Sequence, residues 1–299
     1  MSATSLSLKA ALSQVGADVD RRLDKFLAIP DDPRADLYRA MRHAAIGGGK
    51  RLRPLLVFAT ARLFAVDRDC AGRAATAIEC IHVYSLIHDD LPAMDDDDMR
   101  RGKPTVHKAF DEATAILAGD CLHALAFEIL ADPLTHPDPF VRSELVLDLA
   151  RSAGPSGMAG GQAMDLEAEK STFDLPTVTR LQAMKTGALI ACSVEAGAIL
   201  GKVPPEGRVG LRGYARDMGL AFQIADDILD VEGDEAAVGK KLGKDEGAGK
   251  ETFLSLLGLD RARAQARMLV DQAIEHLQHF GPEADLLRDI ARFTLERDR

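Results

Sequence analysis

Residues 71–98 read AGRAATAIECIHVYSLIHDDLPAMDDDD. The stretch from 71 to 90 is apolar on most faces of a helix, which predicts a helix that is buried all round. The run then ends in a cluster of aspartates that extends from residue 89 to residue 98. A buried carboxylate must be protonated, paired or metal-bound. The stretch therefore predicts a helical core and a polar site where the helix ends.

The spacing within this first aspartate cluster is not that of a simple helix. Asp89 and Asp95 are six residues apart, which separates them on an ideal helix. Pro92 removes a backbone donor and clashes with the preceding turn. We therefore expect the helix to be distorted through 91–94, so that Asp95 comes back toward Asp89. An undistorted helix would align Asp89 with Asp96 instead, and the spacing alone does not choose between the two.

A second aspartate cluster follows at 226–230, after another apolar stretch. One narrow helix face, at about 100° per residue, carries four polar residues: Gln223, Asp226, Asp227 and Asp230. Like charges four residues apart repel each other, so this face requires a positive partner. Carboxylate oxygens, together with water and phosphate oxygens, are the ligands that Mg²⁺ prefers. The two clusters together predict a magnesium site.

Basic residues alternate with these acidic clusters along the chain. They form groups at 50–53, 100–103, 185 and 240–244. The first group follows three glycines at the start of a predicted helix, which is a natural anion site. The Gly-Lys pairs lack the Ser or Thr of a Walker A loop. Acidic and basic groups around a common cavity predict a substrate that carries phosphate.

The composition favours helices over strands. The chain has 46 Ala against 15 Val and 13 Ile, and no stretch shows sustained strand alternation. Helices are expected near residues 5–28, 35–45, 52–66, 71–90, 111–131, 139–151, 156–167, 176–201, 206–232, 259–279 and 283–297, with a loop at 239–250. We therefore expect a single all-α domain of the bundle type over residues 1–299.

Charge and cysteine content bear on partners and location. With 37 Lys+Arg against 47 Asp+Glu the net charge is −10, which disfavours binding to nucleic acid. The four cysteines, Cys70, Cys80, Cys121 and Cys192, have no CxxC spacing and are expected to be free thiols. No window reaches the roughly 18 apolar residues of a membrane span, and no signal peptide is recognisable. We expect a cytoplasmic protein without stable membrane insertion.

Taken together, these motifs resemble the short-chain trans-isoprenyl diphosphate synthases, specifically the bacterial farnesyl diphosphate synthases. The matching segments are GGGKRLRP at 47–54, ECIHVYSLIHDDLPAMDDDDMRRGKPTVH at 79–107, GGQAMDL at 160–166, KTG at 185–187, FQIADDILD at 222–230 and GK at 239–240. The resemblance implies the isoprenoid synthase-type helical bundle around a central cavity, usually as a homodimer. It also implies a Mg²⁺-dependent prenyltransferase that condenses isopentenyl diphosphate with dimethylallyl and geranyl diphosphate to give (2E,6E)-farnesyl diphosphate.

The same resemblance implies roles for single residues in catalysis and binding. Three Mg²⁺ ions would be bound by Asp89, Asp95 and Asp226, with support from Asp90, Asp227 and Asp230. The allylic diphosphate would contact Arg100, Lys185 and Lys240. The diphosphate of isopentenyl diphosphate would contact Lys50, Arg53, His82 and Arg101. The developing allylic cation would face Thr186 and Gln223.

The main alternative within this family is an enzyme that makes a product of another length. The resemblance places chain-length control at Tyr84 and Ser85, just before the first aspartate cluster, and a bulky residue there resembles enzymes that stop at C15. A geranylgeranyl or geranyl diphosphate synthase shares every catalytic residue and stays open.

Two further alternatives differ in the reaction or in its absence. A non-catalytic regulatory subunit of a prenyl synthase is the alternative from another class. Such a subunit has no physical need for both aspartate clusters and the Arg100–Arg101 pair. A head-to-head synthase is disfavoured, because it needs no separate isopentenyl site of the Lys50 and Arg53 kind.

Overall fold

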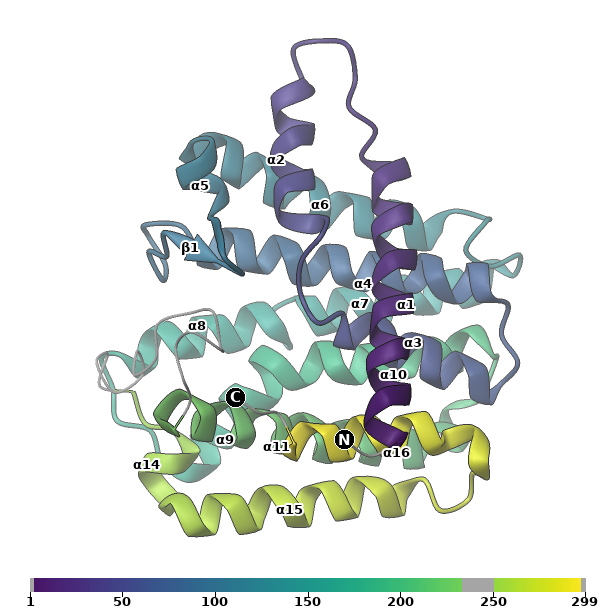
Figure 1. The fold of residues 1–299 in the computed structure, drawn as a ribbon, viewed down its shortest axis with the longest axis vertical. Helices are drawn as coiled ribbons and strands as arrows, with labels where there is room; N and C mark the ends of the chain where they lie inside the picture. Colours follow the sequence, from purple (N-terminus) through teal and green to yellow (C-terminus); the bar gives the residue numbers. More distant parts are fainter. Residues whose placement is uncertain (1–2, 233–249, 297–299) are drawn as a thin grey trace.

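The computed structural model describes residues 3–232 and 250–296, and it is a bundle of helices (Figure 1). Most of the helices run side by side across the view, whereas α1 and α2 stand upright against them (Figure 1). The helical elements are α1 (Ala3–Phe26), α2 (Ala35–Ala45), α3 (Leu52–Leu63), α4 (Arg68–Asp89), α5 (Val106–Ala109), α6 (Glu112–Ala131), α7 (Pro139–Ala153), α8 (Met158–Ala168), α9 (Leu175–Gln182), η1 (Ala183–Gly187), α10 (Ala188–Leu200), η2 (Pro205–Arg208), α11 (Val209–Glu232), α14 (Phe253–Leu257), α15 (Leu259–His276), η3 (Pro282–Ala284) and α16 (Asp285–Leu295). The all-α prediction is confirmed.

Aspartate caps explain why several helices begin where they do. The side chain of Asp67 accepts hydrogen bonds from the backbone N–H groups of Asp69 and Cys70 at the start of α4. Asp111 and Asp174 cap α6 and α9 in the same way. Each cap satisfies backbone donors that have no partner inside the helix. These local signals fix the starts of the helices that surround the site.

Helix α4 lies at the centre of the bundle and packs against α3 and α6. Its alanines at 71, 74, 75 and 77 are at most 1% exposed, which lets neighbouring helices approach closely. A helix that is apolar on most faces loses water on most faces when it packs, and this burial is the main favourable term in folding. The expectation of burial all round holds for residues 71–81, where only Arg73 is half-buried, whereas most residues from 82 to 89 are half-buried.

Four short elements were not expected from the sequence. Strands β1 (Met99–Arg100) and β2 (Lys103–Pro104) form an antiparallel hairpin directly after the first aspartate cluster. Two-residue strands are too short to show an alternating pattern, so nothing in the sequence marked them. The short helices α5 and α14 were missed for the same reason. The expected loop at 239–250 lies outside the described residues except for its last residue.

Two helices in the described part of the chain are long and apolar enough to cross a membrane by length and composition, contrary to the sequence expectation. They are Glu112–Ala131 and Leu175–Leu200. The second includes α10, which packs against α3 and α7, and 61% of its window is buried within the protein. The first is α6, which packs against α4 with one side, but only 39% of its window is buried. An apolar face of α6 is therefore left exposed.

All four cysteines are free, as expected. Cys80 and Cys192 are buried, and burial raises the pKa of the Cys80 thiol to about 12. A thiol with so high a pKa is not a nucleophile at neutral pH. Cysteine chemistry therefore has no place in the candidate site.

Candidate active site

The chain turns sharply at the end of α4 and brings the first aspartates together. The helix ends at Asp89, and the backbone N–H of Asp95 donates to the carbonyl oxygen of Asp89 at 2.8 Å. The expected distortion through 91–94 is thus present. Asp96 adopts a left-handed conformation, with φ of 48°. Asp96 belongs to a different group with Asp98 and His107, whose ligand atoms lie within 4.8 Å of one another.

The first two aspartates of the cluster, Asp89 and Asp90, have pKa values above the usual range. Burial, opposed by the charge of Lys185 and assisted by that of Asp95, raises the pKa of Asp89 to about 6. Burial also raises the pKa of Asp90 to about 6, although Arg100 opposes it. Partly desolvated carboxylates beside one another favour a bound cation or proton. The donor set of hard oxygens fits Mg²⁺.

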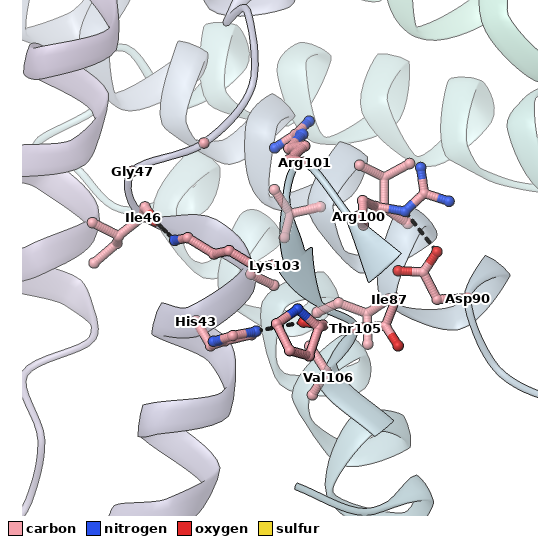
Figure 2. A pocket seen from close by; sticks show the side chains of 15 residues that line it. His43, Ile46, Gly47, Ile87, Asp90, Arg100, Arg101, Lys103, Thr105 and Val106 are labelled. Atoms are coloured by element: carbon pink, nitrogen blue, oxygen red, sulfur yellow. Dashed lines mark hydrogen bonds and ion pairs between the residues drawn. The ribbon is translucent and has the colours of Figure 1, made fainter. Parts of the chain in front are cut away.

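Arg100 is held by the aspartate cluster that precedes it. Its Nε donates to Oδ1 of Asp90 at 2.6 Å, and its Nη2 lies 3.5 Å from Oδ2 of Asp97. Figure 2 shows this contact from the β1–β2 hairpin across to the end of α4. The hairpin thus places a guanidinium group beside the carboxylates.

Lys185 lies on a π-helical turn, η1, which joins α9 to α10. Single π turns inside helices occur frequently at functional sites, because the extra residue redirects a side chain. Here the amino group of Lys185 donates to Oδ2 of Asp165 at 2.9 Å, and that of Lys250 donates to the same oxygen at 2.9 Å. Burial alone would raise the pKa of Asp165, but the two lysines lower it.

Asp165 and Lys250 were missed as site residues by the sequence analysis. The available signal was the GGQAMDL segment, because its glycines permit a close approach of two backbones. A Cβ on Gly161 would lie 2.2 Å from the backbone nitrogen of Lys185, so α8 packs directly against η1. This contact places the Asp165 carboxylate under Lys185.

The aspartates of the second cluster differ in how far they are buried. Asp227 is 6% exposed, and its Oδ2 accepts a hydrogen bond from the backbone N–H of Phe253 at 2.9 Å. Asp227 thereby ties the end of α11 to the start of α14. Gln223, Asp226 and Asp230 are half-buried on α11. Thr186 is half-buried on η1, and Lys240 lies outside the described residues.

A second basic group gathers around His82 on α4. Burial first, and then the charges of Arg53 and Arg101, lower the pKa of His82 well below its usual value. Arg101 lies at the tip of the hairpin with a φ of 54°, and Lys50 is exposed on the preceding loop. A Cβ on Gly49 would be 2.6 Å from the guanidinium carbon of Arg101. The glycine loop therefore passes directly against Arg101, and three of the predicted isopentenyl-site residues lie close together.

A pocket lies beside this basic group, between α2, α4 and the hairpin (Figure 2). Its apolar wall includes Val83, Leu86 and Ile87 of α4, and its polar wall includes Arg100 and Arg101. Figure 2 shows Lys103 reaching the carbonyl of Ile46 and His43 reaching the hairpin. The hairpin is thus held to α2 by side chains that leave both arginines beside the pocket.

The predicted chain-length residues lie at the contact between α4 and α6. The ring of Tyr84 meets His123 of α6 edge-on, with centroids 4.9 Å apart, and meets His88 at 5.7 Å. The Ser85 hydroxyl donates to the carbonyl of His82 at 2.9 Å. Tyr84 is therefore part of an aromatic group that fills the space between these two helices.

Comparisons with known proteins agree with these observations. The family model described as polyprenyl synthetase matches residues 34–289. The farnesyl diphosphate synthase of Escherichia coli is 44% identical and covers 94% of this chain and 95% of its own length. That of Geobacillus stearothermophilus is 42% identical and covers 98% and 99%. Geranylgeranyl diphosphate synthases are also similar, at 39–40% identity.

A solved structure from Zymomonas mobilis, described as an FPP/GFPP synthase in its apo form, has the same fold. It is 59% identical to this chain, with a TM-score of 0.90, and the match covers 97% of this chain and 99% of that one. The likeness therefore extends over nearly the whole length of both chains.

Proposed function

This chain belongs to the polyprenyl synthetase family, and we propose that it condenses isopentenyl diphosphate with dimethylallyl and geranyl diphosphate to give (2E,6E)-farnesyl diphosphate. The observation that carries the proposal is the end of α4. Two half-buried to buried aspartates with raised pKa values face Lys185 and Arg100 there. Such a site suits a substrate whose negative charges are shared between metal ions and basic side chains.

The first step is departure of the allylic diphosphate. Asp89, Asp95 and Asp226 would hold Mg²⁺, which would supply positive charge to stabilise the leaving group. Arg100 and Lys185 add charge-assisted hydrogen bonds to the same diphosphate. Substrate binding would release these two side chains from Asp90 and Asp165, which hold them in the ligand-free protein. Preorganised positive charge of this kind stabilises the charge that develops as the C–O bond breaks.

The second step is attack on the allylic cation by the double bond of isopentenyl diphosphate. Lys50, Arg53, His82 and Arg101 hold the isopentenyl diphosphate group. The attack forms a new C–C bond, and the resulting cation loses a proton to the released diphosphate to give the new allylic product. Burial and the charges of Arg53 and Arg101 lower the pKa of His82 in the ligand-free protein, which favours a neutral ring that can donate one hydrogen bond. Thr186 and Gln223 face the developing cation. The role of the protein is to hold two substrates at reacting distance and to exclude water.

The proposed site has a defined number of metal ions and a set of residues that support their ligands. We assign three Mg²⁺ ions per site, with Asp90, Asp227 and Asp230 supporting the ligands. Asp95, and not Asp96, is assigned as the ligand because the backbone of Asp95 returns to Asp89. Asp227 would support the site indirectly through its hydrogen bond to Phe253. Lys240 is assigned to the allylic diphosphate by resemblance.

A longer product is the second candidate for the same site. The 59% identical Zymomonas structure is described as an FPP/GFPP synthase, and geranylgeranyl synthases are among the relatives. Catalytic residues do not discriminate among product lengths, because each addition repeats the same chemistry. Product length must therefore be read from the product itself.

A homodimer in the cytoplasm is the assembly we propose. The exposed apolar face of α6, with Ile116 and Leu117 about half exposed, suits burial against a second copy. Four free cysteines suit a reducing compartment.

The test is product analysis with purified protein. Incubation with isopentenyl and dimethylallyl diphosphates plus Mg²⁺ should release mostly C15 product, and excess chelator should abolish turnover until Mg²⁺ is restored. Undiminished turnover in chelator would contradict the mechanism. A protein that forms no prenyl product but stimulates a related synthase would instead be a regulatory subunit.

A further inference from the structure

Arg51 lies between two residues assigned to the isopentenyl site, yet its side chain points into the protein. It is 4% exposed and caps the start of α3 in a left-handed conformation, with φ of 51°. That conformation is costly for a residue with a Cβ and persists only where the surroundings hold it. Something specific must therefore hold Arg51 in place.

Three hydrogen bonds from the guanidinium group provide that restraint. Nη1 donates to Oε1 of Glu79 on α4, and Nη2 donates to Oδ1 of Asp20 on α1, each at 2.6 Å. Nη2 also donates to the carbonyl of Ala45 at 2.6 Å. The second oxygen of Asp20 accepts the backbone N–H of Gly47 at 3.2 Å. One arginine thus ties the loop from Ala45 to Arg51 to two helices.

The hydrogen bonds of Arg51 lie next to the basic group around His82. Glu79 is 1% exposed and is one helical turn before His82 on α4. Burial lowers the pKa of Arg101, and the charge of Glu79 opposes that effect. The positive charges of Arg51 and Arg53 likewise act on His82. Glu79 is therefore the buried counter-charge for a cluster of arginines that would otherwise repel one another.

The left-handed turn also determines where the neighbouring side chains lie. Lys50 precedes Arg51, and Arg53 is in the first turn of the helix that Arg51 caps. A change in φ at position 51 would rotate the loop relative to α3. It would move Lys50 and Arg53 apart, and it would shift the glycine loop that passes against Arg101 (Figure 2 shows this loop at Gly47).

We propose that Arg51 is a positioning residue for isopentenyl diphosphate, and that its bonds to Glu79 and Asp20 hold the turn that presents Lys50 and Arg53 to that substrate. The inference rests on the proposed function. Arg51 acts through the loop and not on the substrate, because its side chain is buried and three of its five N–H donors are bonded to protein acceptors.

The alternative is a buried ion pair that stabilises the fold alone, and the chain offers a matched control for it. Arg208 on η2 is also 4% exposed and donates to Glu144 at 2.7 Å and to the carbonyl of Val203 at 2.5 Å. It lies at the opposite end of α11 from the second aspartate cluster. A purely structural role predicts that losing either arginine has the same kinetic consequence.

The experiment measures KM for isopentenyl diphosphate, KM for geranyl diphosphate, kcat and the unfolding midpoint. Arg51→Ala should raise KM for isopentenyl diphosphate by about tenfold or more, the scale of losing a hydrogen bond to a charged group. KM for geranyl diphosphate should change by less than about twofold. Arg208→Ala should lower the midpoint without altering the ratio of the two KM values.

Milder variants keep the proposal testable if Arg51→Ala fails to fold. Asp20→Asn and Glu79→Gln keep the shape and one acceptor oxygen, and each should raise KM for isopentenyl diphosphate selectively. Arg51→Lys keeps the positive charge but not the several N–H donors of the guanidinium group. It should give a KM for isopentenyl diphosphate between those of the wild type and Arg51→Ala. The proposal is overturned if these variants lower the midpoint while the KM ratio stays at the wild-type value. An inactive wild type would overturn the proposed function instead.

Discussion

Tyr84 is the residue at which we expect a growing prenyl chain to stop. Its ring closes the space between α4 and α6 by edge-on contacts with His88 and His123. If the diphosphate binds at Asp89 as proposed, a chain that extends along α4 would reach Tyr84 about one and a half turns earlier on the helix. Overfilling a packed interior costs about 1–3 kcal/mol, which would suppress a further addition roughly 5- to 150-fold.

Tyr84→Ala should therefore admit at least one more isopentenyl unit and give products of C20 or longer. Ionisation of the first substrate should continue, because no diphosphate ligand is removed. Chromatographic sizing of the prenyl products is the measurement. Tyr38→Ala on α2 is the control, since it removes another half-buried tyrosine and should leave C15 as the main product. If the Tyr84→Ala enzyme is fully active and still stops at C15, a residue other than Tyr84 limits the product length.

The charge of Asp89 lowers the free energy of unfolding at neutral pH. Its pKa of about 6 in the folded protein exceeds the usual value of 3.8, so the folded state binds the proton more tightly. The contribution of Asp89 to the free energy of unfolding therefore falls as pH rises from about 4 to about 6, and at neutral pH the charge is a cost.

Asp89→Asn should consequently raise the unfolding midpoint of the chelated protein at about pH 7.5 and raise it less at about pH 4.5. The same variant should lose activity, because it removes a carboxylate that we propose as a metal ligand. Asp271→Asn, which removes an exposed carboxylate on α15, is the control and should show no such pH dependence. A midpoint that falls at both pH values would mean that Asp89 stabilises the metal-free fold.

Some residues of the site are predictable from the sequence and others are not. The aspartates and arginines are visible because unusual runs of like charge carry them. Asp165 and Glu79 are single acidic residues within ordinary helices, and their importance comes from the lysines or arginine that folding brings to them. Such long-range pairs leave no local pattern, so only the packed structure reveals them.

At the scale of elements, the contact between α8 and η1 controls the position of Lys185. A Cβ at Gly161 would lie 2.2 Å from the backbone nitrogen of Lys185 and 2.5 Å from its Cα. Because the colliding atoms are backbone, the two helices must separate to accommodate it. Separation would take Lys185 away from Asp165 and from the end of α4.

Gly161→Ala should lower kcat by roughly tenfold or more, the scale of losing one charge-assisted contact, and should also lower the unfolding midpoint. Steady-state kinetics and thermal unfolding measure the two effects. Gly219→Ala on α11 is the matched control, since the nearest atom to its Cβ would be 3.5 Å away. Equal kinetic losses in both variants would show that glycine flexibility, and not close packing, is what matters.

Helix boundaries were largely predictable, because prolines, glycines and capping aspartates mark them locally. The expected helices at 35–45 and 111–131 agree with α2 and α6 almost residue for residue. The π turn within the 176–201 helix was not predictable in the same way. Its residues have ordinary helical character, and the extra residue is accommodated by packing against α8.

At the scale of the whole molecule, the catalytic elements gather on one side. The end of α4, the β1–β2 hairpin, α8 and α9 lie toward the same edge of the bundle in Figure 1. Helix α6 connects this arrangement to the surface: one side packs on α4 near Tyr84, and the other exposes apolar residues. The contact with Tyr84 and the exposed face thus belong to one helix.

Burial of that face predicts the oligomeric state. Leu117 on α6 is 53% exposed, and Phe140 and Leu147 on the adjoining α7 are 83% and 48% exposed. A charge in the middle of such a face would be desolvated without a partner in a dimer, at a cost of several kcal/mol. Leu117→Glu should therefore convert a dimer to a monomer at micromolar concentration, as measured by light scattering or sedimentation.

Met268→Glu is the control for this test, because Met268 is similarly exposed, at 44%, but lies on α15, away from α6. That variant should keep the mass of two chains. A wild type with the mass of a single chain, or a Leu117→Glu protein that still pairs, would contradict the assignment of this face. If the dimer also supports the cavity wall, the monomeric variant should make longer or mixed products, because α6 would then be free to move away from Tyr84.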